Sequence, residues 1–246
     1  MEQANIELLE AGLKAFGITP RPESVRAVVR HLELVAEWNE RVNLTAITVE
    51  REMVLKHAID SAAAFLVSKL VPGARVLDVG PGAGFPGVTL KCLEPGIDLV
   101  SVESVQKRCK FLDLLGTEVV SPLVGDVKGY EVVWARAEDA GQDGRLREQF
   151  DTVVARAVAE LRVLSELCLP FCRVGGEFLA MKGPAASSEI GLAGSAISKL
   201  GGQIEEVRAI ELPEEAGGRT LIRIRKVNST PKTYPRKAGT PSKQPL

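Results

Sequence analysis

The chain has 246 residues, 45% of them hydrophobic, and its 31 basic and 32 acidic residues leave almost no net charge. This length fits one large α/β domain with a small appendage. No run approaches the roughly 20 apolar residues of a membrane span, and the N-terminus lacks a signal-peptide pattern. Four cysteines without a CxxC pair and only two histidines argue against a disulfide framework and a metal site. We therefore expect a cytoplasmic protein without a bound metal or a membrane contact.

Residues 1–72 are predicted to form an N-terminal helical region packed on the core. Apolar side chains recur with helical spacing over residues 6–16 and again over 25–38, and prolines separate the two runs. A third helix is expected over about residues 49–70.

From residue 73 the pattern changes to short apolar runs that alternate with helices, which predicts βαβ units and a parallel sheet. The expected strands are 75–79, 99–102, 131–135, 152–155 and 177–181, and the expected helices are 87–93, 105–120, 161–171 and 188–200. Two more strands, 204–212 and 219–227, are joined by a loop short enough for an antiparallel hairpin. Residues 73–228 are therefore predicted to be the core domain.

The last segment, residues 229–246, has prolines and basic residues without an apolar period, and it is predicted to be an extended basic arm. From Ala216 to Leu246 there are eight basic and no acidic residues, which leaves 23 basic against 32 acidic residues elsewhere. A basic end on an acidic body suggests a polyanionic partner such as nucleic acid, although a solubilising tail explains the charge equally well.

The most informative stretch is residues 75–87, where a predicted strand ends near Asp78 and the chain turns through Gly80, Gly82 and Gly84 into a helix. Glycines allow a ligand to lie against the backbone, and the following helix directs its free N–H groups at that ligand. This pattern indicates a nucleotide-type site.

Two cofactors compete for the site. Residues 82–87 match GxGxxG, which is typical of NAD binding, but this motif alone is weak evidence. An acid before the glycines instead suits the cationic amino-acid part of S-adenosylmethionine (SAM), which a pyrophosphate would disfavour. Glu103, at the end of the second strand, suits a ribose diol in either case. The closing hairpin and the lack of chain for a second substrate domain favour SAM.

Other segments carry a family resemblance: WNERVNLT at 38–45, KHAIDS at 56–61, KRCKFL at 107–112, RAE at 136–138, ARA at 155–157, MKG at 181–183 and YPRKAGTP at 234–241. With the glycine turn, they resemble the RsmG (GidB) family, bacterial methyltransferases that modify N7 of guanine 527 in the 530 loop of 16S rRNA. The resemblance implies a Rossmann-like class I SAM-dependent methyltransferase fold, with a seven-stranded, mostly parallel sheet whose last strand is antiparallel.

The resemblance also implies which residues bind SAM. In addition to Asp78, Gly82 and Gly84, they would be Gly80, Phe85, Glu103, Ser104, Val105, Ala137, Glu138 and Arg156. The sequence departs from the family pattern in having Glu103 where Asp is common, and a longer stretch over residues 118–130.

Guanine N7 has an in-plane lone pair and no proton, so its methylation needs no general base. Enzymes that methylate an exocyclic amine often carry an Asn/Asp-Pro-Pro-aromatic motif after the fourth strand, where this chain has Ala-Arg-Ala-Val at residues 155–158. We therefore expect catalysis by proximity and alignment without a catalytic acid or base, with Lys182 as the one candidate for a direct role.

Three basic residues are candidates for RNA contact: Lys182 at the end of the fifth strand, and Arg236 and Lys237 in the arm. His57 and Asp60, three residues apart on a helix, are interpreted as a packing pair. The predicted partner is 16S rRNA or the small ribosomal subunit, with a monomeric enzyme. A small NAD-dependent oxidoreductase and a non-catalytic RNA-binding protein remain as alternatives.

Overall fold

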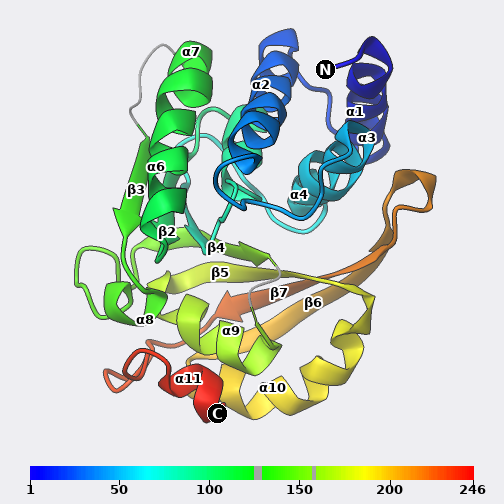
Figure 1. Cartoon of the computed structure of the whole chain (residues 1–246). Coiled ribbons are helices and arrows are strands. Elements are labelled where there is room, and N and C mark those ends of the chain that lie inside the picture. The colour runs from blue at the N-terminus through cyan, green and yellow to red at the C-terminus, as the bar shows by residue number, and fades with distance from the viewer. Residues whose placement is uncertain (125–128, 157–158) are drawn as a thin grey trace.

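The computed structural model describes residues 1–124, 129–156 and 159–246, and its centre is a seven-stranded sheet of order β3-β2-β1-β4-β5-β7-β6 (Figure 1). The strands are β1 (Arg75–Val79), β2 (Asp98–Glu103), β3 (Tyr130–Trp134), β4 (Phe150–Arg156), β5 (Cys172–Lys182), β6 (Gly202–Glu211) and β7 (Gly218–Lys226). The first five are parallel, and β7 runs antiparallel to both β5 and β6. The predicted sheet, with its reversed last strand, is confirmed.

The helices are α1 (Gln3–Ala15), α2 (Pro22–Asn39), α3 (Glu50–Met53), α4 (Asp60–Ala62), α5 (Gly87–Leu93), α6 (Gln106–Leu115), α7 (Ser121–Val124), α8 (Ala137–Ala140), α9 (Leu161–Cys168), α10 (Ser187–Lys199) and α11 (Thr240–Lys243). A π-helix (Val54–Ile59) joins α3 to α4, a second one (Gly116–Val120) joins α6 to α7, and 3₁₀ turns cover Ala63–Leu66, Leu169–Phe171, Pro184–Ala186 and Pro213–Glu215. The predicted third helix is thus a helical run of four pieces, and it ends at Leu66 rather than near residue 70. The long stretch over residues 118–130 lies partly outside the described residues.

Each face of the sheet has its own layer of helices. Helices α1–α7 lie on one side, and α8–α11 lie on the other (Figure 1). The apolar face of α2 supplies Val28, Leu32 and Val35 to the first core, where each is at most 1% exposed. The second core packs α9 and α10 against the sheet. Because both faces are covered, the central strands are mostly apolar, and the few polar residues within them, such as Asp78 in β1 and Ser101 in β2, are buried.

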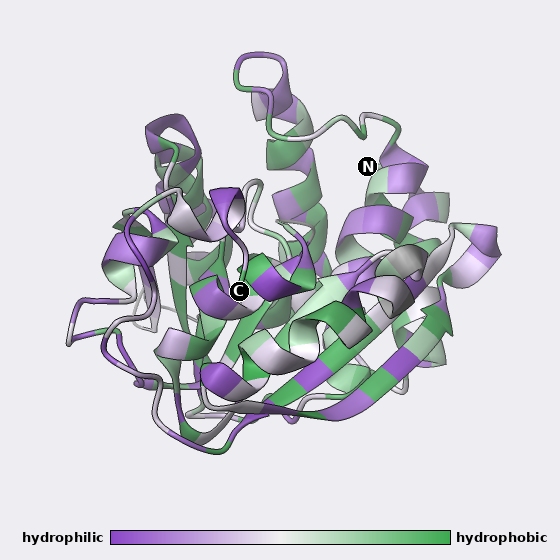
Figure 2. Cartoon of the chain, turned by 90° about the horizontal axis from the view of Figure 1, so that it is seen from below, coloured by the Kyte–Doolittle hydropathy of each residue, from purple (hydrophilic) through white to green (hydrophobic). Residues whose placement is uncertain are grey.

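The edge hairpin β6–β7 is covered less completely. Hydrophilic and hydrophobic residues alternate along its two strands, as Figure 2 shows, and the β6 side chains alternate in burial over most of the strand. Such alternation is expected for antiparallel strands with one wet face. The described part of the chain contains no helix that is long and apolar enough to cross a membrane.

Candidate cofactor-binding site

The glycine turn connects β1 to α5 at the carboxyl edge of the sheet. Gly80, Gly82 and Gly84 have φ values of +70°, +57° and +90°, so all three occupy the left-handed region that side chains disfavour. The Gly80 N–H donates to the Val102 carbonyl at 2.9 Å, which ties the turn to β2. Open α/β sheets bind ligands at this edge.

Asp78 lies behind the turn. Its carboxylate is fully buried, and Oδ2 accepts a hydrogen bond of 2.7 Å from the Gly87 N–H at the start of α5. Among the residues that the structure describes, Oδ1 has no hydrogen-bond partner. Burial raises the pKa of the Asp78 carboxyl to about 7. Asp78 therefore fastens the turn to the start of α5, and it does not line the cavity that opens beside Glu103.

Glu103 joins the turn to the end of β2. Its Oε2 accepts from the Gly82 N–H at 3.2 Å, and its Oε1 accepts from the Val105 N–H at 2.9 Å. The residue is 3% exposed. Each carboxylate oxygen has a second lone pair left, so Glu103 is suited to accept the two hydroxyl groups of a ribose.

A cavity of about 200 Å³ opens beside Glu103. It is lined by Val79, Gly80, Val102, Glu103, Ser104, Ala135, Arg136, Ala137, Glu138, Ala159, Leu167 and Ser242. Five of the predicted cofactor residues meet here, namely Gly80, Glu103, Ser104, Ala137 and Glu138. A ribose acceptor beside small apolar side chains fits the adenosine part of SAM. Sequence reasoning missed Ser242, because nothing local relates it to residues more than 100 positions earlier.

Phe85 does not line this cavity, and it is held between two imidazoles. Its ring stacks on His31 of α2, with centroids 4.4 Å apart, and on His57, with centroids 4.6 Å apart. Burial lowers the pKa of His31 to about 4, and burial and the nearby Arg156 lower the pKa of His57 to about 3. Both imidazoles are therefore neutral near pH 7. Through these two rings, the N-terminal helical region packs against the glycine turn of the core domain.

Arg156, at the end of β4, is the centre of a polar network. It donates to Asp60 Oδ2 at 3.1 Å, to the Lys56 carbonyl at 2.9 Å, and to His57 Nδ1 at 3.2 Å. Because Nδ1 accepts there, Nε2 of His57 carries the proton and donates to the Thr45 hydroxyl at 2.8 Å. Asp60 Oδ1 also accepts from Arg219, at 2.9 Å.

This network changes the interpretation of His57 and Asp60. The two residues serve structure, as expected, but each is bound to Arg156 rather than simply packed against the other. The guanidinium carbon also lies 5.3 Å from the centroid of the Phe85 ring. Ala157 and Val158, which complete the motif after β4, lie outside the described residues.

The three candidates for RNA contact differ in their surroundings. Lys182 is largely buried, and its Nζ lies 2.5 Å from the Ala159 carbonyl and 2.9 Å from Glu189. Arg236 forms an ion pair of 2.6 Å with the buried Glu166. Lys237 is exposed. The segment 229–246 thus differs from the extended arm that was predicted, because it folds back onto α8 and α9 and ends with α11 (Figure 1).

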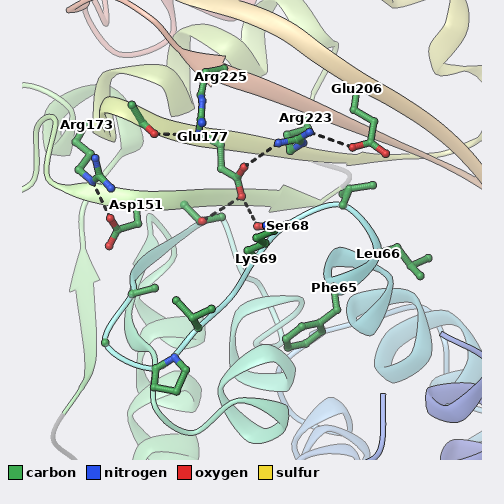
Figure 3. A pocket seen from close by; sticks show the side chains of 17 residues that line it. Phe65, Leu66, Ser68, Lys69, Asp151, Arg173, Glu177, Glu206, Arg223 and Arg225 are labelled. Atoms are coloured by element: carbon green, nitrogen blue, oxygen red, sulfur yellow. Dashed lines mark hydrogen bonds and ion pairs between the residues drawn. The ribbon is translucent and has the colours of Figure 1, made fainter. Parts of the chain in front are cut away.

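A larger hollow, of about 790 Å³, lies at the opposite edge of the sheet, where the parallel strands begin (Figure 3). Its guanidinium groups face carboxylates: Arg173 donates to Asp151 at 2.7 Å, and Arg223 pairs with Glu206 at 3.2 Å. Glu177 accepts a short hydrogen bond from Ser68. Because these charges compensate one another and lie away from the glycine turn, the hollow is not the cofactor site.

Comparisons with known proteins show the family to which the chain is similar. The model of the family described as rRNA small subunit methyltransferase G (GidB) matches residues 24–216. A "Ribosomal RNA small subunit methyltransferase G" of Symbiobacterium thermophilum is 59% identical over 239 residues, which cover 97% of this chain and 97% of that protein. A protein of the same name from Pelotomaculum thermopropionicum is 45% identical, and the match covers 98% of each chain.

Solved structures are similar in fold. TrmN from Thermus thermophilus superposes with a TM-score of 0.52 at 16% identity, covering 69% of this chain and 49% of its own. A predicted O-methyltransferase from Agrobacterium tumefaciens gives a TM-score of 0.52 at 20% identity, covering 67% and 79%.

Proposed function

This chain belongs to the rRNA small subunit methyltransferase G family and is a SAM-dependent methyltransferase, and from that premise we propose that it methylates N7 of a guanine in 16S rRNA, guanine 527 of the 530 loop. The observation that carries the proposal is the joining of the glycine turn, Glu103 and the adenosine-sized cavity in a chain with full-length relatives of that name. The oxidoreductase and the non-catalytic RNA-binding protein are not favoured.

The described residues suit a reaction without proton transfer. SAM supplies a methyl group on a positively charged sulfur. His31 and His57 are neutral and buried. His57 uses both ring nitrogens in contacts with Thr45 and Arg156, and His31 uses Nε2 in a contact with the Ala83 carbonyl, whereas the buried Nδ1 of His31 has no hydrogen-bond partner among the described residues. Arg156 is bound to Asp60. These residues fix the shape of the glycine turn and of the end of β4. A site of fixed shape accelerates methyl transfer by aligning the methyl group with its nucleophile, and guanine N7 needs no activation by a base.

We infer that RNA contact is shared unequally among the three basic candidates. Lys237 is exposed, and its ammonium group has no ion-pair partner among the described residues, so it is suited to a phosphate. The guanidinium of Arg236 already has Glu166, and Lys182 already has Glu189. Removing Lys237 should weaken RNA binding and reduce its salt dependence, and removing Arg236 should act mainly through the fold.

We also propose that the enzyme works as a monomer in the cytoplasm on rRNA or on the small subunit. Sedimentation at micromolar concentration tests the first point, and comparing naked 16S rRNA with assembled small subunits as substrates tests the choice of partner.

The decisive experiment offers SAM and unmodified 16S rRNA, naked or within small subunits, to the purified protein. Mass spectrometry of the digested rRNA should find 7-methylguanosine in the fragment that contains guanine 527, and Glu103→Ala should reduce it by weakening SAM binding. Methylation of another atom or only of other molecules would contradict the proposal. Calorimetric binding of NAD without SAM would reverse the choice of cofactor.

A further inference from the structure

The C-terminal segment, defined as residues 229–246, is held to the core at several points. Arg236 donates to Glu166 through its backbone N–H at 2.9 Å and through its side chain at 2.6 Å. Arg147 donates to the carbonyls of Thr230 at 2.8 Å and Tyr234 at 2.7 Å. The course of the C-terminal segment is therefore set by side chains of the core domain.

The carboxylate of Glu166 is the main anchor of the segment on the core domain. The residue lies on α9 and is 0% exposed, whereas a carboxylate is rarely buried unless it is paired. Both of its oxygens accept hydrogen bonds from the Arg236 side chain. If the guanidinium were removed while the segment stayed in place, Glu166 would be a buried charge with no compensation, which proteins avoid. The ion pair therefore fixes how the segment lies on α9.

Beyond Arg236 the segment leads to the cofactor cavity. Glu138 Oε1 accepts a hydrogen bond of 2.8 Å from the Gly239 N–H, and Gly239, with φ of +81°, begins the turn into α11. Ser242 of α11 lines the cavity with Glu138 and Leu167. Every other described lining residue comes from residues 79–167, so α11 forms a wall that the core domain does not supply.

The size of the cavity agrees with this closure. At about 200 Å³, it lies below the roughly 300 Å³ at which pockets for small molecules begin. It therefore holds only part of a cofactor, and a ligand placed there touches both the strand ends and α11.

We propose that the C-terminal segment is the outer wall of the adenosine part of the SAM site, with Ser242 in contact with the cofactor and Glu138 as the residue that positions the wall through Gly239. The segment then contributes to cofactor retention, since α11 supplies one side of the cavity. This inference rests on the SAM site and not on the choice of RNA target.

The test compares two tryptophan substitutions in neighbouring positions of α11. Ser242→Trp places bulk against the cavity, whereas Lys243→Trp places the same bulk on an exposed residue that does not line it. Calorimetry without RNA should show SAM binding weakened about tenfold or more by Ser242→Trp, and by less than about twofold by Lys243→Trp. Equal affinities in the two variants would overturn the proposal.

A second measurement tests retention directly. Arg236→Ala removes one of the attachments of the segment and loosens its course toward α11. Stopped-flow displacement of SAM should then show a dissociation rate increased about fivefold or more, with circular dichroism checking that the variant stays folded. An unchanged rate in a folded variant would contradict the proposal. Absence of SAM binding by the wild-type protein would refute the cofactor assignment instead, so the two failures are distinguishable.

Discussion

Replacing Asp78 by asparagine is expected to change the stability of the ligand-free protein by an amount that depends on pH. The folded-state pKa of this buried carboxyl is about 7, against an ordinary value of 3.8. As the pH rises, the Asp78 carboxyl therefore keeps its proton in the folded state to a higher pH than in the unfolded state. Stability from this group is fully present below about pH 4 and is lost as the pH rises through about 7.

The size of the effect follows from the two pKa values. Between about pH 5 and about pH 8, Asp78 should lower the free energy of unfolding of the wild-type protein by about 2.5 kcal/mol. The asparagine of the variant has no charge to bury, and its unpaired amide hydrogens cost a constant amount of about 1–3 kcal/mol. The difference between the two proteins should therefore shift in favour of the variant as the pH rises.

Urea unfolding of both proteins at the two pH values measures this shift. The titrations of His31 and His57 cancel in the comparison, because both proteins contain them. Asp113→Asn is the control, since Asp113 is exposed on α6. A shift below about 0.5 kcal/mol in Asp78→Asn, or an equal shift in the control, would refute the view that Asp78 is held in a desolvated site behind the turn.

Three further outcomes are expected. Asp60→Asn leaves the guanidinium groups of Arg156 and Arg219 without their shared carboxylate. Urea titration should show a free energy of unfolding lowered by about 2–4 kcal/mol. A loss below about 0.5 kcal/mol would argue that solvent already screens the network. Gly84→Ala should cost more stability than Gly82→Ala and should weaken SAM binding, because a Cβ at Gly84 would lie 2.8 Å from His31 Nε2 and one at Gly82 meets nothing within 4 Å; equal thermal shifts in the two variants would contradict this. The pKa values of His31 and His57 are lowered, so the stability they contribute is present above about pH 6.5 and lost on acidification, by about 2 kcal/mol each at about pH 5; in His57→Gln the urea midpoint should fall less between about pH 7.5 and about pH 5 than in the wild-type protein.

The order of elements could be predicted because each depends on its own short stretch of chain. Apolar runs of a few residues between helical patterns located six of the seven strands to within two residues at each end, and β1 matched at both ends, whereas β5 begins five residues before the predicted strand. The helix boundaries of the core domain were predicted equally well, since α5 matched at both ends and α10 differed by one residue, but the helical type within two runs was not predicted. The run beginning at Glu50 contains a π-helix, and α6 continues into another, because tertiary packing rather than local propensity sets those bonds.

The segment 229–246 shows why local pattern was insufficient there. Prolines and basic residues without an apolar period indicate an extended arm, and no local feature shows that Glu166 lies buried 70 residues earlier, facing Arg236. The ion pair between Arg236 and the buried Glu166 holds the segment against α9.

The sequence by itself determined the glycine turn, since the backbone torsions at Gly80, Gly82 and Gly84 are available to glycine at little cost. It also determined the alternation of strands and helices that brings Glu103 to the same edge of the sheet as that turn. Only the tertiary structure decided that Asp78 lies behind the turn, that Arg156 binds Asp60 across 96 positions of chain, and that Ser242 reaches the cavity. The reason is physical: torsional preference and periodicity act over a few residues, whereas burial and charge pairing depend on which distant segments pack together.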